Sequence, residues 1–346
     1  MTWCLPGCST NLLTVPGLET PPLAMRGDER MGGDRGLPFE HVPVMPKEVI
    51  HYLDPGPGKT ILDSTLGGAG HATKILEAGA ALIGLDQDPN ALSHAAQRLE
   101  EYGDAVALRQ LNFSEMLAAG REICPEGVDG ILMDLGVSSH QLDCAERGFS
   151  LRAQGPLDMR MNPDEGVTAA EVVNEWDETE LARIFWELGE ERKSRAVAGS
   201  IVRRRVIKPF RDTLDLADCV SRVIGRKGRI HPATRVFQAL RMTVNREMEC
   251  LEAALESAPA LLKPGGRIAV ITFHSLEDRM VKRFFKSRSQ PEIDRPEWPA
   301  ARSNPDFCMN RVTRRPVVAE PDEVKKNPRS RSAKLRIAEM RKVGAS

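Results

Sequence analysis

The sequence has few cysteines and no long apolar run. The cysteines number seven, at positions 4, 8, 124, 144, 219, 250 and 308, and no two of them have the C-x-x-C spacing of a zinc site. Neither a disulfide framework nor a metal site is therefore predicted. No stretch of 18 apolar residues is present, so we expect no membrane span and no membrane partner. A reducing, cytoplasmic location fits this composition best.

The N-terminal part lacks the marks of a targeting sequence. The first 25 residues contain no Lys or Arg, whereas a secretory signal begins with basic residues and a mitochondrial presequence is rich in Arg. Residues 1–38 are rich in Pro, Gly and Thr, without periodicity. We expect a disordered extension, or a stretch upstream of the true start codon with Met25 and Met31 as alternative starts.

The chain taken as a whole has the composition of a folded protein. Its 346 residues correspond to two domains, or to one domain with a large insertion, at about 150 residues per domain. Hydrophobic residues at 41% and charged residues at 28% exclude a disordered, collagenous or coiled-coil chain. The formal net charge of −1 argues against a nucleic-acid partner, but this sum hides a partition of charge.

Two segments are strongly basic. Residues 279–346 hold 18 Lys and Arg against 8 Asp and Glu, a net charge of +10, and residues 192–229 hold 12 Lys and Arg against 3 Asp, a net charge of +9. One such segment would be interpreted as a solvated face. Two of them, including the runs 192–195 and 203–205, indicate a polyanionic partner. We expect both segments to converge around one edge of the predicted sheet.

Short apolar runs alternate with helical patterns, which predicts a doubly wound parallel α/β sheet. Helices are expected over 44–53, 71–78 and 89–101, and strands over 60–63, 80–85, 106–111, 128–134 and 267–273. Residues 142–232 break this pattern, because they contain only helical stretches, at 168–189, 191–206 and 213–224. A single helix is then expected over 233–262. We predict a sheet domain of residues 39–141 and 233–346, with residues 142–232 inserted as an all-helical domain for substrate recognition.

Ligand-binding side chains follow the predicted strands at their carboxyl ends, where such sheets bind ligands. Asp63 and the turn Gly67–Gly70 follow the first strand, Asp86 ends the second, Phe113 follows the third and Asp134 ends the fourth. An acid after the second strand can accept both hydroxyls of a ribose. A nicotinamide dinucleotide would require a third glycine that this turn lacks, so S-adenosylmethionine fits better.

Asp134 has two interpretations, a helix cap or a group that holds an amine beside the methyl donor and accepts its proton. C5-cytosine chemistry is disfavoured, because the nearby Cys144 lacks the usual preceding proline. DNA cytosine-N4 and adenine-N6 methyltransferases are also disfavoured. They normally carry a Pro-Pro-aromatic stretch after the acid that ends the fourth strand, and residues 135–137 here are LGV. An RNA-binding assembly factor with a vestigial cofactor site stays open.

Ten ordered motifs closely resemble the small-subunit ribosomal RNA cytosine-N4 methyltransferase family, RsmH (formerly MraW), over roughly residues 39–340. They are HVPV (41–44), DSTLGGAGH (63–71), DQDP (86–89), DLGVSS (134–139), ERGFS (146–150), GPLDMRM (155–161), GEER (189–192), HPATRVFQ (231–238), FHSLEDR (273–279) and NPRSRS (327–332). The resemblance implies a class I Rossmann-like S-adenosylmethionine methyltransferase. It also implies N4-methylation of a specific decoding-centre cytidine of 16S rRNA within the small ribosomal subunit, and leaves a homodimer open.

The resemblance also implies site residues. The cofactor contacts fall on Ala69, Gly70, His71, Asp86, Phe113, Asp134 and Gln141, with Asp134 as the candidate catalytic group. Ala69 stands where the family usually has a glycine, and we expect a backbone contact there.

Two other segments have alternative interpretations. His274 and Ser275 either face the substrate base or form a turn in which Ser275 caps the next helix. Residues 158–160 either shape the pocket or lead into the insertion.

Overall fold

The computed structural model describes residues 43–151, 153–225, 228 and 230–342, and the predicted extension 1–38 lies outside these residues. In the described ranges, every helix is too short or too polar to cross a membrane.

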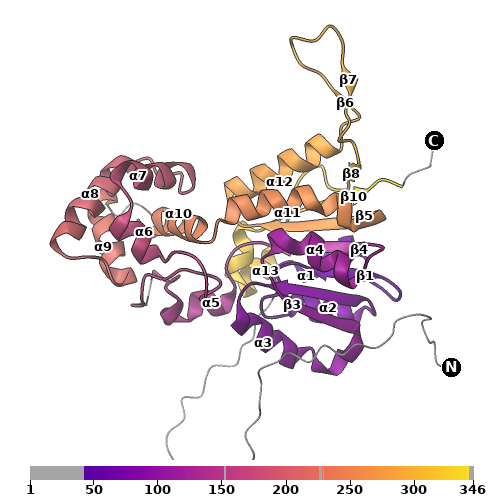
Figure 1. The fold of residues 1–346 in the computed structure, drawn as a ribbon, viewed down its shortest axis with the longest axis horizontal. Helices are drawn as coiled ribbons and strands as arrows, with labels where there is room; N and C mark the ends of the chain where they lie inside the picture. Colours follow the sequence, from indigo (N-terminus) through magenta and orange to yellow (C-terminus); the bar gives the residue numbers. More distant parts are fainter. Residues whose placement is uncertain (1–42, 152, 226–227, 229, 343–346) are drawn as a thin grey trace, which may run out of the picture. The chain divides into compact units, whose positions relative to one another are not determined.

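The fold is built on one mixed β-sheet (Figure 1). Its strand order is β3-β2-β1-β4-β5-β10-β8, and β9 pairs with β10. Strands β1 to β5 run parallel to one another, whereas β10 runs antiparallel to β5. The strands are β1 (Thr60–Asp63), β2 (Ala81–Asp86), β3 (Val106–Gln110), β4 (Val128–Asp134), β5 (Leu262–Thr272), β8 (Met309–Arg311), β9 (Val317–Val318) and β10 (Lys334–Met340). The predicted α/β class is confirmed.

Helices cover both faces of this sheet, because successive strand residues point to opposite sides. Ile131 packs in the core beneath α4, α11 and α12, whereas the neighbouring Leu132 packs in the core beneath α1, α2 and α3. The helices are α1 (Pro46–Leu53), α2 (Gly70–Glu77), α3 (Pro89–Arg98), α4 (Met116–Ile123), α11 (Glu247–Leu261) and α12 (Ser275–Arg288). The strand order reverses between β1 and β4, which is where doubly wound sheets bind their ligands.

A helical segment with its own hydrophobic core separates β4 from β5. It contains α6 (Ala169–Glu175), α7 (Glu178–Glu187), α8 (Ser194–Ile207), α9 (Thr213–Ile224) and α10 (Thr234–Val244), and the short α5 (Ser139–Asp143) precedes it. The core extends from Phe149 to Val244, so α10 packs with this segment. Figure 1 shows these helices beside the sheet, with α10 leading back to α11.

Two predicted helices are each divided in two. The stretch 168–189 breaks at Trp176, whose backbone is extended, and Asp177 then caps α7 by accepting a hydrogen bond from the Glu180 amide. The stretch 233–262 breaks at Arg246, which adopts a left-handed conformation with φ 48°. Neither break has a proline or glycine to mark it in the sequence.

The basic tail, residues 279–346, contains short strands and a helix that the sequence pattern does not predict. After α12, the strands β6 (Glu292–Ile293) and β7 (Arg302–Ser303) form a hairpin that projects from the sheet (Figure 1). Helix α13 (Pro321–Lys326) follows, and β10 then inserts between β5 and β8. Strand β5 also begins earlier than the predicted 267–273, because residues 263–266 lie within it, where the pairing with β4 shifts register.

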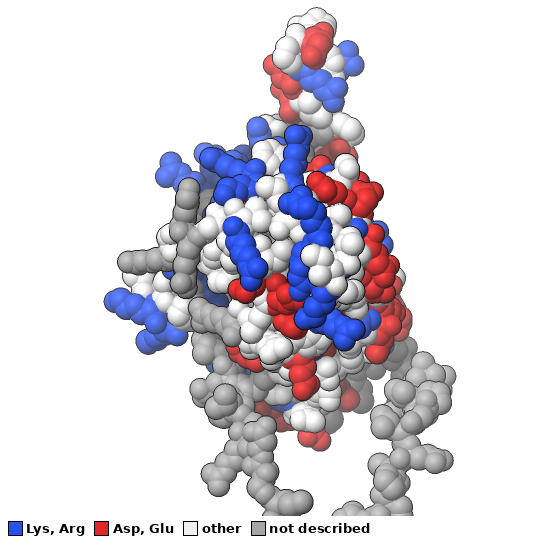
Figure 2. Space-filling model, turned by 90° about the vertical axis from the view of Figure 1, so that its left-hand side faces the viewer, with Lys and Arg blue, Asp and Glu red and all other residues white. Residues whose placement is uncertain are grey.

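Basic side chains are spread over the side of the molecule that carries the helical segment, while acidic side chains gather along one edge of that view (Figure 2). Not all of the predicted basic runs are available to a partner. Arg204 pairs with Asp215, and Arg205 donates hydrogen bonds to the carbonyl oxygens of Val173 and Trp176. Arg203 is exposed and has no hydrogen bond or ion pair in the described part of the chain. Arg204 and Arg205 therefore stabilise the helical segment, and a contact between the run 203–205 and a polyanion stays a prediction.

Candidate active site

A cavity of about 370 Å³ opens at the carboxyl ends of β1, β2 and β4. Six of the seven predicted cofactor residues line it, namely Gly70, His71, Asp86, Phe113, Asp134 and Gln141. They come from the strand ends and from the first turns of the following helices, which the parallel sheet gathers at one edge. Residues far apart in the sequence thus meet as the strand pattern predicts.

Ala69 is the exception among the seven. It is fully buried and does not line the cavity. Its N–H donates to the carbonyl of Leu66, and its own carbonyl accepts from Thr73, so no backbone group is left for a ligand. Ala69 has the left-handed backbone conformation, with φ 58°, that glycine adopts more easily.

The glycine turn is held against the end of β2 by Asp86. The two oxygens of this carboxylate accept hydrogen bonds from the amides of Gly67, at 2.8 Å, and Asp88, at 2.9 Å. Burial nevertheless raises the pKa of Asp86 to about 6. Burial also raises the pKa of the neighbouring Asp63 to about 6, with further contributions from Asp134 and Asp86. The edge of the sheet is thus a cluster of carboxyl groups that a cationic ligand would stabilise.

His71 and Asp134 face each other with incomplete hydrogen bonding. The Nε2 atom of His71 lies 3.6 Å from Oδ2 of Asp134. Within the described residues, neither ring nitrogen of His71 nor Oδ1 of Asp134 has a hydrogen-bond partner, although all three atoms are buried. Buried polar atoms are rarely left unpaired, so these atoms are prepared to bind a ligand. The interpretation of Asp134 as a helix cap is not borne out, because Ser138 is the residue that caps α5.

Gln141 lines the cavity, but its side chain is already engaged. Its amide nitrogen donates to Asp88 at 3.0 Å, and its oxygen accepts from the Ser138 amide in a capping box. Gln141 therefore supports the wall of the cavity through its contacts with Asp88 and α5.

The wall opposite the strand ends was not predicted from the sequence. It contains Arg241, Asn245, Glu247 and Glu277, together with residues 327–329 and Ser332. Glu277 and Asn327 belong to two motifs quoted above, but no local pattern places them beside the glycine turn. Met161 also lines the cavity, whereas Asp158 and Arg160 pair with each other outside it.

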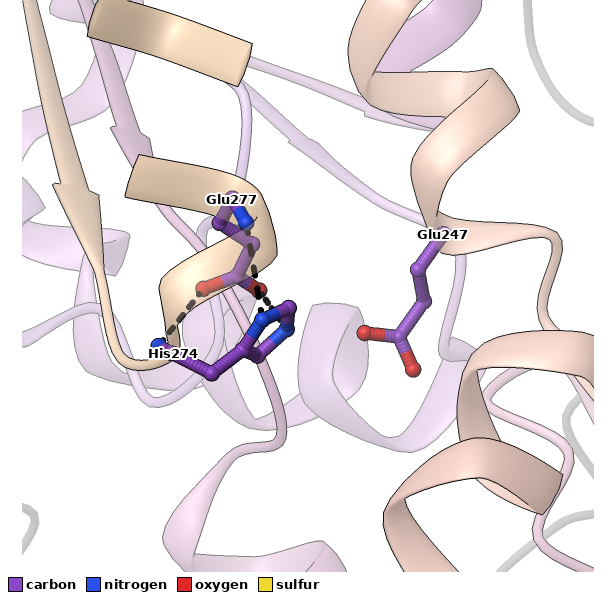
Figure 3. A group of neighbouring side chains, drawn as sticks. All are labelled: Glu247, His274 and Glu277. Atoms are coloured by element: carbon purple, nitrogen blue, oxygen red, sulfur yellow. Dashed lines mark hydrogen bonds and ion pairs between the residues drawn. The ribbon is translucent and has the colours of Figure 1, made fainter. Parts of the chain in front are cut away.

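One group in this wall has donor atoms of the kind that bind metals. One possible ligand atom from each of Glu247, His274 and Glu277 lies within 4.8 Å of the other two (Figure 3). Both carboxylates are already bound, since Glu247 pairs with Arg241 through two bonds of 2.7 Å and Glu277 accepts from the Phe273 amide at 2.8 Å. Burial alone would raise the pKa of Glu277, but the imidazole of His274 and the Arg241 guanidinium hold it below its ordinary value. A metal would have to displace these partners.

The beginning of α12 shows that His274 and Glu277 form a helix cap. The His274 side chain accepts a hydrogen bond from the Glu277 amide, and the Glu277 carboxylate accepts one from the His274 amide. The prediction that Ser275 caps this helix is therefore wrong. Ser275 instead donates to Glu190, at the beginning of the helical segment's α7–α8 connection.

Comparison with known proteins decides the family. Residues 38–341 match the MraW methylase family. The chain belongs to this family. The MraW match covers both the sheet and the helical segment, and it confirms the predicted class of enzyme, an S-adenosylmethionine-dependent methyltransferase on a Rossmann-like sheet.

Several MraW relatives are close in sequence. The chain is 48% identical over 310 residues to ribosomal RNA small subunit methyltransferase H of Heliobacterium mobile, covering 88% of this chain and 99% of the relative. It is 52% identical over 309 residues to the protein of that name from Geobacter sulfurreducens, with the same coverage. A solved rRNA methylase from Streptococcus thermophilus aligns with a TM-score of 0.38 and 10% identity, over 86% of this chain and 94% of that one. That structural likeness is too distant to carry an argument.

Proposed function

We propose that this protein transfers the methyl group of S-adenosylmethionine to the N4 amine of a decoding-centre cytidine of 16S rRNA, within the small ribosomal subunit. The observation that carries the proposal is the cavity at the strand ends, which joins Asp86, the glycine turn and the unpaired atoms of His71 and Asp134. The names of the relatives support the choice of small-subunit rRNA as the substrate. We also propose a cytoplasmic location for the enzyme, together with this substrate.

The residues of the cavity fit S-adenosylmethionine. When bound, this cofactor supplies a methyl group on a positively charged sulfur. We propose that Asp86 accepts the ribose hydroxyls, that Gly70 and His71 contact the amino-acid part, and that Phe113 packs beside the adenine. The carboxyl groups of Asp63, Asp86 and Asp134 would compensate the positive charge of the ligand.

Asp134 is the proposed catalytic group. It ends β4, and its amide donates to the Thr65 hydroxyl at 2.6 Å, which fixes the backbone while the carboxylate lines the cavity. A carboxylate held there can accept a hydrogen bond from the cytosine amine and then take its proton. Orientation of the amine toward the methyl donor supplies much of the rate in such chemistry.

The helical segment is the proposed RNA-binding part of the enzyme. We keep the predicted division into a sheet domain and an inserted helical domain of residues 142–232, with α10 packed on the inserted part. Phosphate contacts would come from exposed cations such as Arg195 and Arg203, because electrostatic contacts give most of the nonspecific affinity for RNA. The target cytosine must leave its stack to enter the cavity.

The test is methyl transfer from a labelled cofactor to small ribosomal subunits and to naked 16S rRNA, with the modified nucleotide identified by mass spectrometry. The proposal expects N4-methylcytidine at one position in at least one substrate, and a loss of about 10²-fold or more in Asp134→Asn. A control variant, Asp104→Asn, changes an exposed acid outside the cavity lining.

Two results would contradict the proposal. Absence of transfer to both substrates would favour an RNA-binding assembly factor. Transfer to another atom or nucleotide would keep the methyltransferase and reject the N4 assignment.

A further inference from the structure

A second hollow, of about 470 Å³, lies between the helical segment and α12. Its lining consists of Trp186, Glu187, Glu190, Arg192, Arg235, Leu276 and Arg279, none of which lines the cofactor cavity. These residues come from α7, from the connection that follows it, from α10 and from α12. Three motifs, at 189–192, 231–238 and 273–279, therefore meet here, and the proposed methyl transfer uses none of these lining residues.

An exposed tryptophan forms one wall of the hollow. The side chain of Trp186 is 59% exposed, and no other aromatic residue is among the large exposed hydrophobic side chains of the described chain. Its neighbours on α7, Ile184 and Phe185, are buried in the helical core. The indole has thus been left on the surface although burying an aromatic ring is favourable. A flat exposed ring offers a surface on which an RNA base can stack.

Three arginines also line the hollow. Arg192 is exposed and has no hydrogen bond or ion pair with any described residue. Arg235 is exposed and donates to the Glu190 carbonyl at 3.1 Å, and Arg279 is 50% exposed and lies 3.3 Å from the Glu190 carboxylate. The other acid, Glu187, is paired with Arg183 at 2.8 Å. Three arginines thus face one carboxylate, that of Glu190, which has no described cation from outside the hollow beside it, so the hollow has a net positive charge.

Glu190 organises this arrangement. It has a left-handed backbone, with φ 48°, a conformation that costs free energy for a residue other than glycine. In this conformation its carboxylate accepts from Ser275 at 2.9 Å as well as from Arg279. The preceding Gly189 has no room for a side chain, because a Cβ would meet the carbonyl oxygens of Phe185 and Arg235 at 2.7 Å. The turn is therefore shaped to place Arg192, Arg235 and Arg279 around one opening.

We infer that this hollow is a second nucleotide subsite, in which one base of single-stranded RNA next to the target stacks on Trp186. Arg192 and Arg235 bind the phosphate beside that base, and Glu190 positions Arg279 and Arg235. Arg192 belongs to the basic segment of the insertion and Arg279 to the basic tail, so one cation from each meets here. This inference rests on the proposed function, since it takes RNA as the substrate.

The test compares Trp186→Ala, Trp186→Phe and Arg192→Ala with the wild-type chain. For methylation of small subunits, Trp186→Ala should raise KM about fivefold or more, which is the low end of the contribution of base stacking. Both kcat and the cofactor Kd should stay unchanged, and Trp186→Phe should keep most of the affinity. Arg192→Ala should reduce the slope of log affinity against log salt by about 0.7 for a single-stranded RNA oligonucleotide.

Trp298→Ala is the matched control, because this tryptophan lies on the connection between β6 and β7, packed against the guanidinium groups of Arg295 and Arg302. Equal effects of Trp186→Ala and Trp298→Ala would overturn the inference. An unchanged KM in Trp186→Ala would also overturn the inference. If methyl transfer is normal in that variant, the proposed function is unaffected. If the wild-type chain transfers no methyl group, oligonucleotide affinity still tests the subsite. Trp186-dependent binding of an acidic peptide in place of RNA would assign the hollow to a protein partner.

Discussion

The guanidinium of Arg147 donates to the carboxylate of Asp88 over 2.7 Å, and the two side chains are only 12% and 1% exposed. The second amino group of Arg147 donates to the carbonyl oxygens of Arg160 and Met161. Asp88 begins α3 directly after the proposed ribose-binding strand end, and Met161 lines the cavity from the other side. One buried arginine thus joins the cofactor side of the cavity to the segment that leads into the helices.

Arg147→Met should destabilise the protein by about 3 to 5 kcal/mol, because it leaves the Asp88 carboxylate buried without its partner. Thermal or denaturant unfolding measures this loss. The double variant Asp88→Asn/Arg147→Met should recover part of it. Arg109→Met is the control, since its pair with Glu122 is exposed and such pairs contribute at most about 1 kcal/mol. A similar small loss in both single variants would contradict the structural role of Arg147.

Cofactor affinity should fall as the pH drops below about 6. The pKa of Asp86 is raised to about 6 by burial, and a ribose hydroxyl and a positive sulfur both favour the ionised carboxylate. Protonation therefore competes with binding, by up to about tenfold per pH unit for one group. Calorimetry between pH 5 and 8 measures the Kd. Asp86→Asn should bind more weakly at pH 7.5 and with a shallower pH dependence, and an unaltered Kd would remove Asp86 from the site.

Asp63→Asn should stabilise the ligand-free protein at pH 7.5. Burial raises the folded-state pKa of Asp63 to about 6, so the folded state binds this proton more tightly than the unfolded state does. The free energy of unfolding therefore falls as the pH rises from about 4 to about 6. Above that range the destabilisation by the ionised Asp63 carboxylate is complete. The gain on substitution should be on the order of 2 kcal/mol at pH 7.5 and shrink toward pH 4. Equal melting temperatures of variant and wild type at pH 7.5 would refute this.

Arg204→Ala and Arg203→Ala should affect different properties, although the two residues are neighbours in the chain. Arg204 pairs with Asp215 and lies 4.7 Å from the centre of the Phe210 ring, so its loss should lower stability by about 1 to 2 kcal/mol. Arg203 is exposed and should contribute to RNA affinity and its salt dependence, with little change in the melting temperature. The comparison of melting curves with RNA titrations separates the two roles, and a stability loss confined to Arg203→Ala would contradict the assignment.

Local signals made the cofactor side of the site predictable. Each parallel strand ends in a residue that the sequence marks, as Asp86 and Asp134 do, and the sheet topology brings those ends together without further information. The opposite wall depends on long-range contacts. The side chain of Asn245 bonds to the backbone of Met159 and Met161, and these bonds stand beside the break between α10 and α11. No pattern within 233–262 reports those partners, so one long helix was expected.

The roles of the charged residues are likewise only partly predictable from the sequence. The basic runs were visible in the sequence, but their partners are set by the packing of α8 on α9 and on the end of α6. Arg203 and Arg204 are adjacent in the chain, yet only Arg204 meets an acid. The spacing of charged residues indicates a polyanion partner, and only the folded structure separates cations that stay exposed without a partner from cations that hold helices together.

The position of β10 makes assembly of the sheet depend on a late part of the chain. This strand is the link between β5 and β8, so until residues 334–340 have been synthesised, β5 presents an unpaired edge over residues 267–272. An open, apolar strand edge is a template for pairing with other chains. A chain interrupted before Lys334 should therefore aggregate even though every residue of the cofactor cavity has already been made, and a growing chain needs protection of β5 until its final strand emerges.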